Sequence, residues 1–243
     1  MSERVQKVVG IIGGMGPEST ADLFRRITEL TQTQCEQEHL HVIVDSNPKV
    51  PDRTGYLLGR NESPLSALLE SVSRLEEAGA EVVGIACNTA HFWHEQLQSS
   101  TRMQILDMVK LAAADACGET SEGDAVGVLA TWGTVRMRLY ERALSALGRR
   151  SLVPEQAEQD ELMDCIYGDE GVKLGRVAEN RGRIEVIWRG LLARGAKVVI
   201  AGCTEVMLPF RTVTGDAVTG LPSRLIDPIS VLAKKLVEVA SGS

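Results

Sequence analysis

The sequence predicts an α/β fold with two pseudo-symmetric, duplicated domains, each a mostly parallel sheet flanked by helices, and with the active site in the cleft between them. Two observations lead to this prediction. Short β-branched apolar runs, too short for buried helices, alternate with amphipathic helical patterns along the 243 residues, as is typical of parallel sheets with crossover helices. The same succession of patterns then begins again near the middle of the chain.

The duplication is visible as three pairs of similar segments in the same order, at offsets of 117, 116 and 120 residues. The matched pairs are 10–16 with 127–133, 79–87 with 195–203, and 105–107 with 225–227. We therefore expect a first domain at 1–107 and a second at 108–227. The C-terminal helix at 228–243 is expected to pack back onto the first domain.

Apolar runs and capping residues place the elements of the first half. We expect strands at 5–12, 40–46, 81–86 and 102–106, and helices at about 17–34, 63–78 and 88–98. Two prolines, Pro48 and Pro51, predict that 47–55 is an extended loop rather than a helix.

The second half follows from the matches and from its own amphipathic patterns. We expect strands in the apolar runs that begin at Ala125 and Lys197 and at 225–227, and helices at 137–147, 156–167, 179–194 and 228–240. The glycine-rich stretch 168–175, which carries Lys173, is expected to be a loop.

Charge and hydropathy exclude several classes of protein. The net charge of −7 and the isoelectric point near 5.3 disfavour nucleic acid and anionic membranes as partners. The sequence has no stretch of membrane-spanning length and begins without a signal peptide, so we expect a cytoplasmic location. Five cysteines without tight pairs, and histidines without metal-ligand spacing, predict reduced thiols and no metal site.

The glycine-rich turn at 13–16 leads from a strand into a helix. Such a turn permits close backbone approach to a ligand, and the helix start offers N–H groups to a carboxylate or phosphate. The segment lacks both common nucleotide-binding patterns. The alternative is a tight turn without a ligand.

Cys87 and Cys203 each follow a buried strand at matched positions of the duplication. Two thiols on either side of one carbon suit inversion at a C–H centre, because one removes a proton and the other delivers one. A following helix N-terminus would lower each thiol pKa, and His91 could tune Cys87. The alternative is that each is a small buried core residue, which is our interpretation of Cys35, Cys117 and Cys165.

The motifs GIIGGMGPEST (10–20), NPKVPDRT (47–54), ACNTAH (86–91), GVLATWGT (127–134), VKLGR (172–176), AGCTEV (201–206) and IDP (226–228) resemble the cofactor-independent aspartate/glutamate racemase superfamily, most closely its aspartate racemase branch. This resemblance implies a racemase without pyridoxal phosphate or metal, in which Cys87 and Cys203 each act on one enantiomer. It also implies that Arg53 and Lys173, each on its own a solvated surface charge, hold substrate carboxylates.

The remaining substrate-binding candidates come from the same resemblance and from the ends of the predicted strands. They are Met15, Asn47, Asn88, Thr89, Ala90, Thr131, Thr134, Thr204 and Glu205. Backbone N–H groups at 88–90 would stabilise charge that develops as Cα loses its proton. Glutamate racemases of cell-wall synthesis carry Asp-Ser where Gly13-Gly14 stand here, and a histidine in place of Glu205, so we discount that role.

The sequence thus predicts an isomerase that racemises aspartate, with glutamate as an additional substrate, and without a cofactor. Its partners are expected to be a small acidic amino acid and a second copy of the chain in a homodimer. Two alternatives remain open. One is an isomerase or decarboxylase of a dicarboxylic acid on the same fold, and the other is a non-catalytic protein that binds acidic metabolites.

Overall fold

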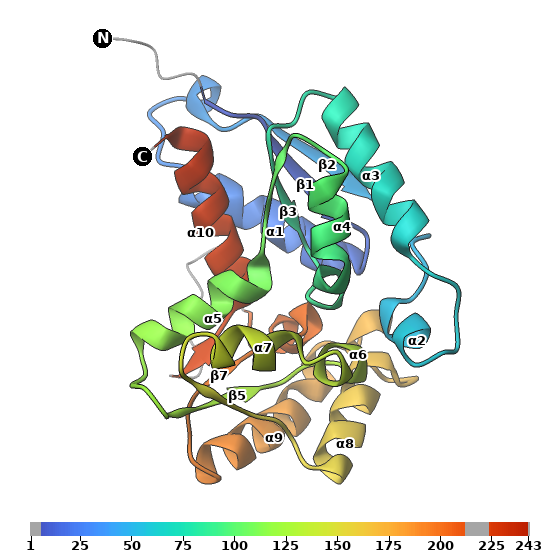
Figure 1. Cartoon of the computed structure of the whole chain (residues 1–243), viewed down its shortest axis with the longest axis vertical. Coiled ribbons are helices and arrows are strands. Elements are labelled where there is room, and N and C mark those ends of the chain that lie inside the picture. Colours follow the sequence, from blue (N-terminus) through green and yellow to red (C-terminus); the bar gives the residue numbers. More distant parts are fainter. Residues whose placement is uncertain (1–5, 212–223, 243) are drawn as a thin grey trace. The chain divides into compact units, whose positions relative to one another are not determined.

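The structure is a computed structural model that describes residues 6–211 and 224–242. The chain forms two compact units, one of Met1–Met108 with Ile229–Ser243 and one of Val109–Pro228 (Figure 1). Each unit is built on a four-stranded parallel sheet with helices packed against it. The predicted α/β class and duplication are therefore confirmed.

The sheet of the first unit has the strand order β2-β1-β3-β4. Its strands are β1 (Val9–Gly13), β2 (Val42–Ser46), β3 (Val82–Ile85) and β4 (Gln104–Leu106). The central strands β1 and β3 are buried along their whole length, which explains why they are apolar runs rather than alternating patterns. The edge strand β2 is only partly buried.

Helices cover both faces of this sheet. The helices of the unit are α1 (Pro17–Leu30), α2 (Arg53–Leu57), α3 (Leu65–Glu77), α4 (His94–Ser99) and the C-terminal α10 (Pro228–Ser241), with short 3-10 helices η1 (Glu36–Glu38) and η2 (Thr89–Trp93); α2 lies beside η2 rather than on the sheet. A Cβ on Gly84 would lie 2.8 Å from Leu236 of α10, whereas a Cβ on Gly10 would meet Leu75 of α3 at 3.2 Å. Gly10 pairs with Val83, so these two residues face the same side of the sheet, whereas Gly84, the next residue, faces the other side. Helices α3 and α10 therefore lie on opposite faces.

Helix α10 is tied to the first unit by polar contacts as well. Buried Arg26 bonds Asp22 through Nε (2.9 Å) and donates through Nη1 to the Ser230 hydroxyl (2.7 Å). The Lys7 N–H donates to the Ala240 carbonyl at the far end of the helix (3.0 Å). Helix α10 therefore packs on the sheet of the first unit, although it follows the second unit in the sequence.

The second unit repeats the arrangement with the strand order β6-β5-β7-β8. Its strands are β5 (Ala125–Val128), β6 (Arg150–Leu152), β7 (Ala196–Ile200) and β8 (Leu225–Ile226). Its helices are α5 (Met108–Gly118), α6 (Trp132–Arg136), α7 (Leu139–Ser145), α8 (Gln156–Tyr167) and α9 (Arg181–Ala193), with 3-10 helices η3 (Val172–Leu174), η4 (Ala178–Asn180), η5 (Thr204–Val206) and η6 (Leu208–Phe210). In both sheets, the third strand in the order precedes a cysteine of the matched pair.

Several predicted elements differ from the observed ones. The range 47–55 is not an extended loop throughout, because the Asp52 carboxylate accepts from the Gly55 N–H (2.6 Å) and caps the short helix α2. The helix expected from 88 begins as the 3-10 helix η2 and becomes α-helical only at His94. Strand β6 and helix α5 were missed. The predicted start of the first strand, Val5, lies outside the described residues.

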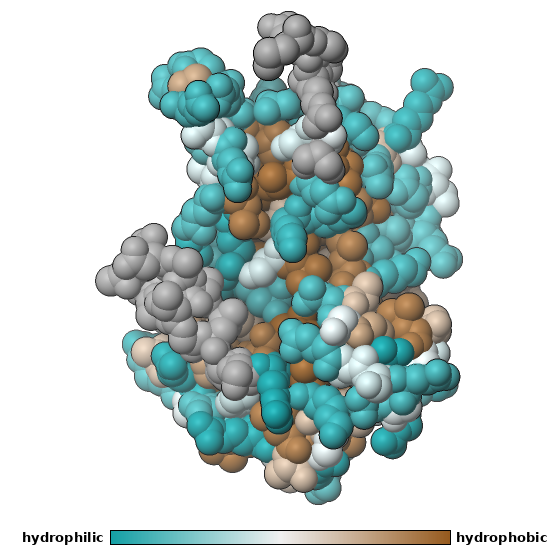
Figure 2. All heavy atoms as spheres, turned by 90° about the vertical axis from the view of Figure 1, so that its left-hand side faces the viewer, coloured by the Kyte–Doolittle hydropathy of each residue, from teal (hydrophilic) through white to brown (hydrophobic). Residues whose placement is uncertain are grey.

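Figure 2 shows one face, on which hydrophilic side chains predominate and apolar ones appear between them. Within residues 6–211 and 224–242, each helix is too short or too polar to span a lipid bilayer.

The loop after β1 offers a test of close packing. Gly14 has φ +85°, and a Cβ there would lie 2.3 Å from the Asn47 carbonyl carbon. Gly14→Ala should therefore cost more stability than the roughly 1–2 kcal/mol of a left-handed alanine. Gly59→Ala is the matched control, because Gly59 has φ +75° with nothing within 4 Å. Urea unfolding measures both variants, and equal losses would contradict this account.

Candidate functional site

Cys87 lies just beyond the end of β3, at the carboxyl edge of the first sheet. Its side chain is 6% exposed and belongs to a buried apolar cluster with Met15 and Ala90. The Cys87 carbonyl bonds Nδ1 of His91 at 2.9 Å, and Nε2 of His91 accepts from the Met108 N–H at 3.1 Å. The backbone that carries the thiol is therefore fixed by an imidazole.

His91 has a positioning role. Since Nε2 accepts a hydrogen bond, the ring hydrogen lies on Nδ1 and is donated to the Cys87 carbonyl. Burial lowers the pKa of His91, although Asp107 acts in the opposite direction. The histidine is therefore neutral, and both ring nitrogens bond to main chain. These contacts replace the hypothesis that His91 tunes the thiol.

The glycine-rich turn uses one of its N–H groups internally. The Gly14 N–H donates to the Thr20 hydroxyl (2.8 Å), which in turn donates to the Gly16 carbonyl (2.9 Å). A Cβ on Gly13 would lie 2.2 Å from the Thr20 side chain. Thr20, which the sequence analysis did not single out, thus shapes the turn that carries Met15.

Arg53 is buried, at 8% exposed, rather than solvated. Its Nη1 donates to the carbonyls of Val50 and Pro51 (3.1 Å each), and its Nη2 donates to the carbonyl of Met15 (3.1 Å). The guanidinium therefore joins the loop after β1 to the loop after β2. Asn47, in the same region, accepts from the Lys49 N–H through Oδ1 (3.0 Å).

The residues that follow Cys87 are also buried. Asn88 is 2% exposed, Thr89 5% and Ala90 0%. Asn88 is the N-cap of η2, and Thr89 and Ala90 are its first two residues, so the three predicted binding residues lie next to the thiol in one compact turn. A five-residue 3-10 helix has only a small dipole compared with a longer α-helix.

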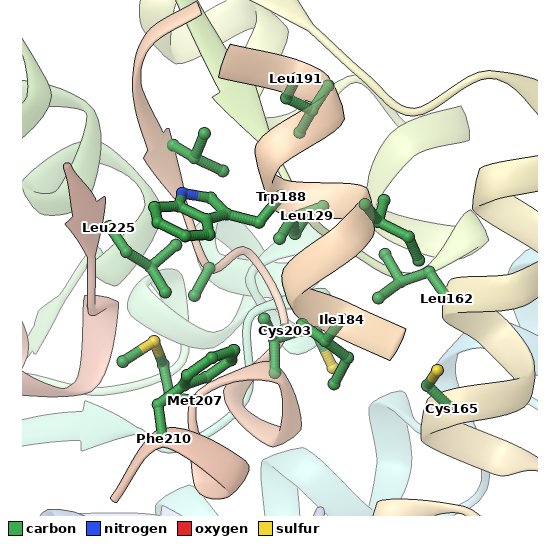
Figure 3. Close-up of a cluster of buried hydrophobic side chains, with 14 of the residues drawn as sticks. Leu129, Leu162, Cys165, Ile184, Trp188, Leu191, Cys203, Met207, Phe210 and Leu225 are labelled. Carbon is green, nitrogen blue, oxygen red and sulfur yellow. The ribbon is translucent and has the colours of Figure 1, made fainter. Parts of the chain in front are cut away.

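In the second unit, Cys203 follows β7 and lies within a buried apolar cluster that includes Ile184 and Met207 (Figure 3). Its thiol donates to Oε2 of Glu205 at 3.1 Å, and the Thr204 hydroxyl donates to the same oxygen at 2.9 Å. The other carboxylate oxygen, Oε1, lies 2.5 Å from Nζ of Lys173. Four predicted site residues are thus in direct contact through one carboxylate.

The ionisation of this cluster differs from the sequence prediction. Burial and then the adjacent Glu205 raise the pKa of Cys203 well above its ordinary value, while Lys173 partly opposes them. Burial alone would raise the pKa of Glu205 too, but Lys173 and three hydrogen bonds outweigh it and lower that pKa. The predicted lowering of the Cys203 pKa is therefore wrong, because η5 has only three residues and an anion lies beside the sulfur.

Asn180 holds the loop that carries Lys173 through two hydrogen bonds. This buried side chain donates through Nδ2 to the carbonyls of Glu170 and Arg176, both at 2.7 Å. The Lys173 ammonium also lies 5.4 Å from the centre of the Tyr167 ring, within cation–π range. Neither Asn180 nor Tyr167 is among the site residues predicted from the sequence, although Tyr167 directly precedes the glycine-rich loop.

Thr131 and Thr134 lie at the start of α6, after β5. The Thr131 hydroxyl caps this helix by accepting from the Thr134 N–H (3.4 Å), and both side chains are buried. Nearby, a Cβ on Gly202 would lie 2.8 Å from the Tyr140 ring. Glycine is thus required for the close approach that sets the chain before Cys203.

In the part of the chain that the structure describes, no group of three or more His, Cys, Asp and Glu side chains is arranged to hold a metal ion. All five cysteines are free thiols. Cofactor independence and the homodimer stay predictions.

Comparison with known proteins identifies the family. The family model described as Asp/Glu/Hydantoin racemase matches residues 12–236. This chain belongs to that family. A solved structure of Picrophilus torridus aspartate racemase shares 28% identity, with a TM-score of 0.80 over 97% of this chain and 94% of that one.

Two further relatives of this racemase-family protein cover nearly its whole length. An aspartate racemase homologue from Pyrococcus horikoshii has 25% identity and a TM-score of 0.70 over 97% of this chain and 99% of that one. The broad specificity amino-acid racemase RacX of Bacillus subtilis is 22% identical, over 95% of this chain and 96% of its own length.

The buried His91 predicts a pH dependence of stability. Its pKa is lowered in the folded state, so the unfolded chain binds a proton first as pH falls below about 6.5. The free energy of unfolding should then decrease as the pH is lowered, by at most ~1.4 kcal/mol per pH unit for this one group. His91→Gln should reduce this slope in urea unfolding at pH 5–7, whereas His41→Gln, at an exposed position, should not. Identical slopes in all three proteins would contradict the assignment.

Proposed function

We propose that this protein racemises an acidic amino acid, aspartate first, without a cofactor and with Cys87 and Cys203 as the two acid–base groups. The observation that carries the proposal is their equivalence. Each cysteine is 6% exposed, follows the strand that lies third in its sheet order, and precedes a 3-10 helix by no more than two residues. Equivalent reactive groups in duplicated units suit a reaction that treats two enantiomers alike.

Racemisation requires that a proton leave Cα and that another arrive on the opposite face. A Cα–H is a very weak acid, so the developing negative charge needs electrostatic stabilisation. In our proposal, backbone N–H groups of the buried turn at 88–90 supply it, together with the substrate-facing polar groups after β5. Met15, Asn47, Thr131, Thr134 and Thr204 are proposed to line the substrate.

The acidic substrate is proposed from two cations and from the relatives. Arg53 in the first unit and Lys173 in the second are held by specific contacts at the carboxyl edges of the sheets. Charge-assisted bonds from such groups suit a carboxylate. The aspartate racemase of Picrophilus torridus supports aspartate. Glutamate is included, because one methylene is worth only about 1–3 kcal/mol of discrimination.

A second candidate, decarboxylation of a dicarboxylic acid, is favoured by one observation. The raised pKa of Cys203 keeps it as a thiol, which is the form that a sole proton donor needs. Release of carbon dioxide from a dicarboxylic acid incubated with the protein would support this second candidate. Absence of both racemisation and carbon dioxide release would indicate a protein that only binds acidic metabolites.

The central experiment is hydrogen exchange in deuterium oxide. L-aspartate incubated with the pure protein, without pyridoxal phosphate, should lose both its optical rotation and its Cα–H signal in nuclear magnetic resonance. Glutamate and neutral amino acids such as alanine complete the panel, since the relative RacX is named a broad specificity racemase. No exchange with any of them would reject the proposal.

The two-base scheme predicts the behaviour of the cysteine variants. Cys87→Ser and Cys203→Ser should each abolish inversion, because each removes one of the two proton carriers. Exchange of one enantiomer without inversion is compatible with the scheme. Cys165→Ser, at another buried free cysteine, is the matched control and should retain activity. A fully active Cys87→Ser or Cys203→Ser variant would rule out two-base catalysis.

Arg53 predicts a selective loss. Arg53→Met should lower kcat/KM for aspartate by roughly 10- to 100-fold more than for alanine, because only the acidic substrate loses a charge-assisted bond. Loss of the Arg53 bonds to the carbonyls of Met15, Val50 and Pro51 lowers kcat/KM for both substrates. The ratio between the two substrates therefore excludes this structural part of the loss. Equal losses on both substrates would restrict Arg53 to holding the two loops together.

A further inference from the structure

The Glu205 carboxylate is shared between a cation and a thiol. Its Oε1 lies 2.5 Å from Nζ of Lys173, and its Oε2 accepts from Sγ of Cys203 at 3.1 Å. The side chain of Glu205 is 4% exposed, whereas that of Lys173 is 20% exposed. The carboxylate is thus enclosed, while its counter-ion can be reached from solvent.

This arrangement places one proton between two groups. The ammonium against Oε1 holds the negative charge on the carboxylate, so the proton stays on sulfur. The directions of the two pKa values agree, since that of Cys203 is raised and that of Glu205 lowered. In a buried pair of this kind the proton belongs to the pair, and its position depends on nearby charge.

The ammonium is the movable part of the cluster. Lys173 has a flexible stem and lies in the three-residue helix η3, beside Leu174, which is 67% exposed. An ammonium has three donors, and a carboxylate that arrives from solvent would attract it away from Glu205. Cys203 and Glu205, in contrast, are fixed in the chain that follows β7.

We propose that Lys173, Glu205 and Cys203 form a proton-position switch in which the side-chain carboxylate of the substrate draws Lys173 off Glu205, and Glu205 then takes the proton of Cys203. The inference rests on the proposed function and deepens it. Glu205 is thereby a positioning residue for a proton, rather than a group that binds substrate. The acidic side chain of the substrate then both binds to Lys173 and causes the proton of Cys203 to move.

The transfer conserves atoms and charge. The S–H bond of Cys203 breaks, an O–H bond forms on Oε2 of Glu205, and the electron pair remains on sulfur. The thiolate then takes the Cα proton, and the Cys87 thiol supplies a proton to the carbanion. After product release, Glu205 loses its proton to solvent as Lys173 returns, and the Cys87 thiolate gains one.

The switch predicts an asymmetry between the two directions. In the direction in which Cys203 removes the proton, the substrate's acidic side chain raises kcat as well as lowering KM, because it is needed to form the base. In the opposite direction Cys203 acts as a thiol, so displacement of Lys173 gives no advantage there, and Cys203 must take its proton back from Glu205 before it can donate it.

A spectroscopic test needs no turnover. Infrared difference spectra should show that binding of succinate, a dicarboxylate without a chiral centre, creates a protonated-carboxyl band and removes an S–H band. Both changes should be absent in Glu205→Gln. Lys173→Met should show the protonated carboxyl without succinate, whereas Lys235→Met, which removes a lysine paired with Glu238 on α10, should behave as the unaltered protein. A carboxyl that stays ionised with saturating succinate overturns the switch.

The pH profile of racemisation gives a second test. In the unaltered protein, thiolate forms without loss of a proton to solvent. In Glu205→Gln it requires such a loss, so kcat/KM in one direction only should rise by about tenfold per pH unit below the thiol pKa. Equal profiles in both directions overturn the switch. Turnover without the carboxyl band rejects this inference alone, and the band without turnover of any amino acid rejects only the proposed racemisation.

Discussion

The parallel pairing of four strands is the constraint on which each unit depends. Parallel strands run in one direction, so each chain segment must return across the sheet through a helix before the next strand begins. All carboxyl ends then lie at one edge. In the first unit the loops after β1, β2 and β3 carry Met15, Arg53 and Cys87 to that edge. In the second, the loops after β5 and β7 do the same for Thr131 and Cys203.

Burial of these edges sets the electrostatics. A buried charge is costly unless it is paired and hydrogen-bonded, and both cations of the candidate site obey this rule. Arg53 is held by main-chain carbonyls from two loops, whereas Lys173 lies over the Tyr167 ring and pairs with a carboxylate that also accepts from a thiol. The two cations predicted to hold a substrate therefore differ. One is fixed within the scaffold, and the other is paired with a carboxylate for which we propose a change of protonation.

The sequence predicted the elements best where the local signals were strongest. The helix at 156–167 was predicted with the observed bounds of α8, because its capping box and polar first turn are local features. Strand β6 was missed, since 150–152 is short and only partly buried at the sheet edge. Helix α2 was missed because two prolines suggested a loop, although the Asp52 cap after them begins a helix.

The residues of the candidate site were also predicted only in part. Cys87 and Cys203 were found from a repeat at one offset, and Arg53 and Lys173 from a family resemblance. Asn180 and Thr20 were not found, because they act through hydrogen bonds to carbonyl and N–H groups of a loop. The order of side chains along the sequence does not reveal such bonds. The role of His91 changed for the same reason, as both its partners are main-chain atoms.

By itself, the sequence determined that two similar parallel sheets are built and that a cysteine follows the same strand in each, since both facts follow from apolar periodicity and repetition along the chain. Only the tertiary structure decided how the Cys203 thiol is ionised. Residue 205 is two positions away in sequence and residue 173 is 30 away, and their charges act on sulfur through distance and burial. Both quantities exist only in the folded chain.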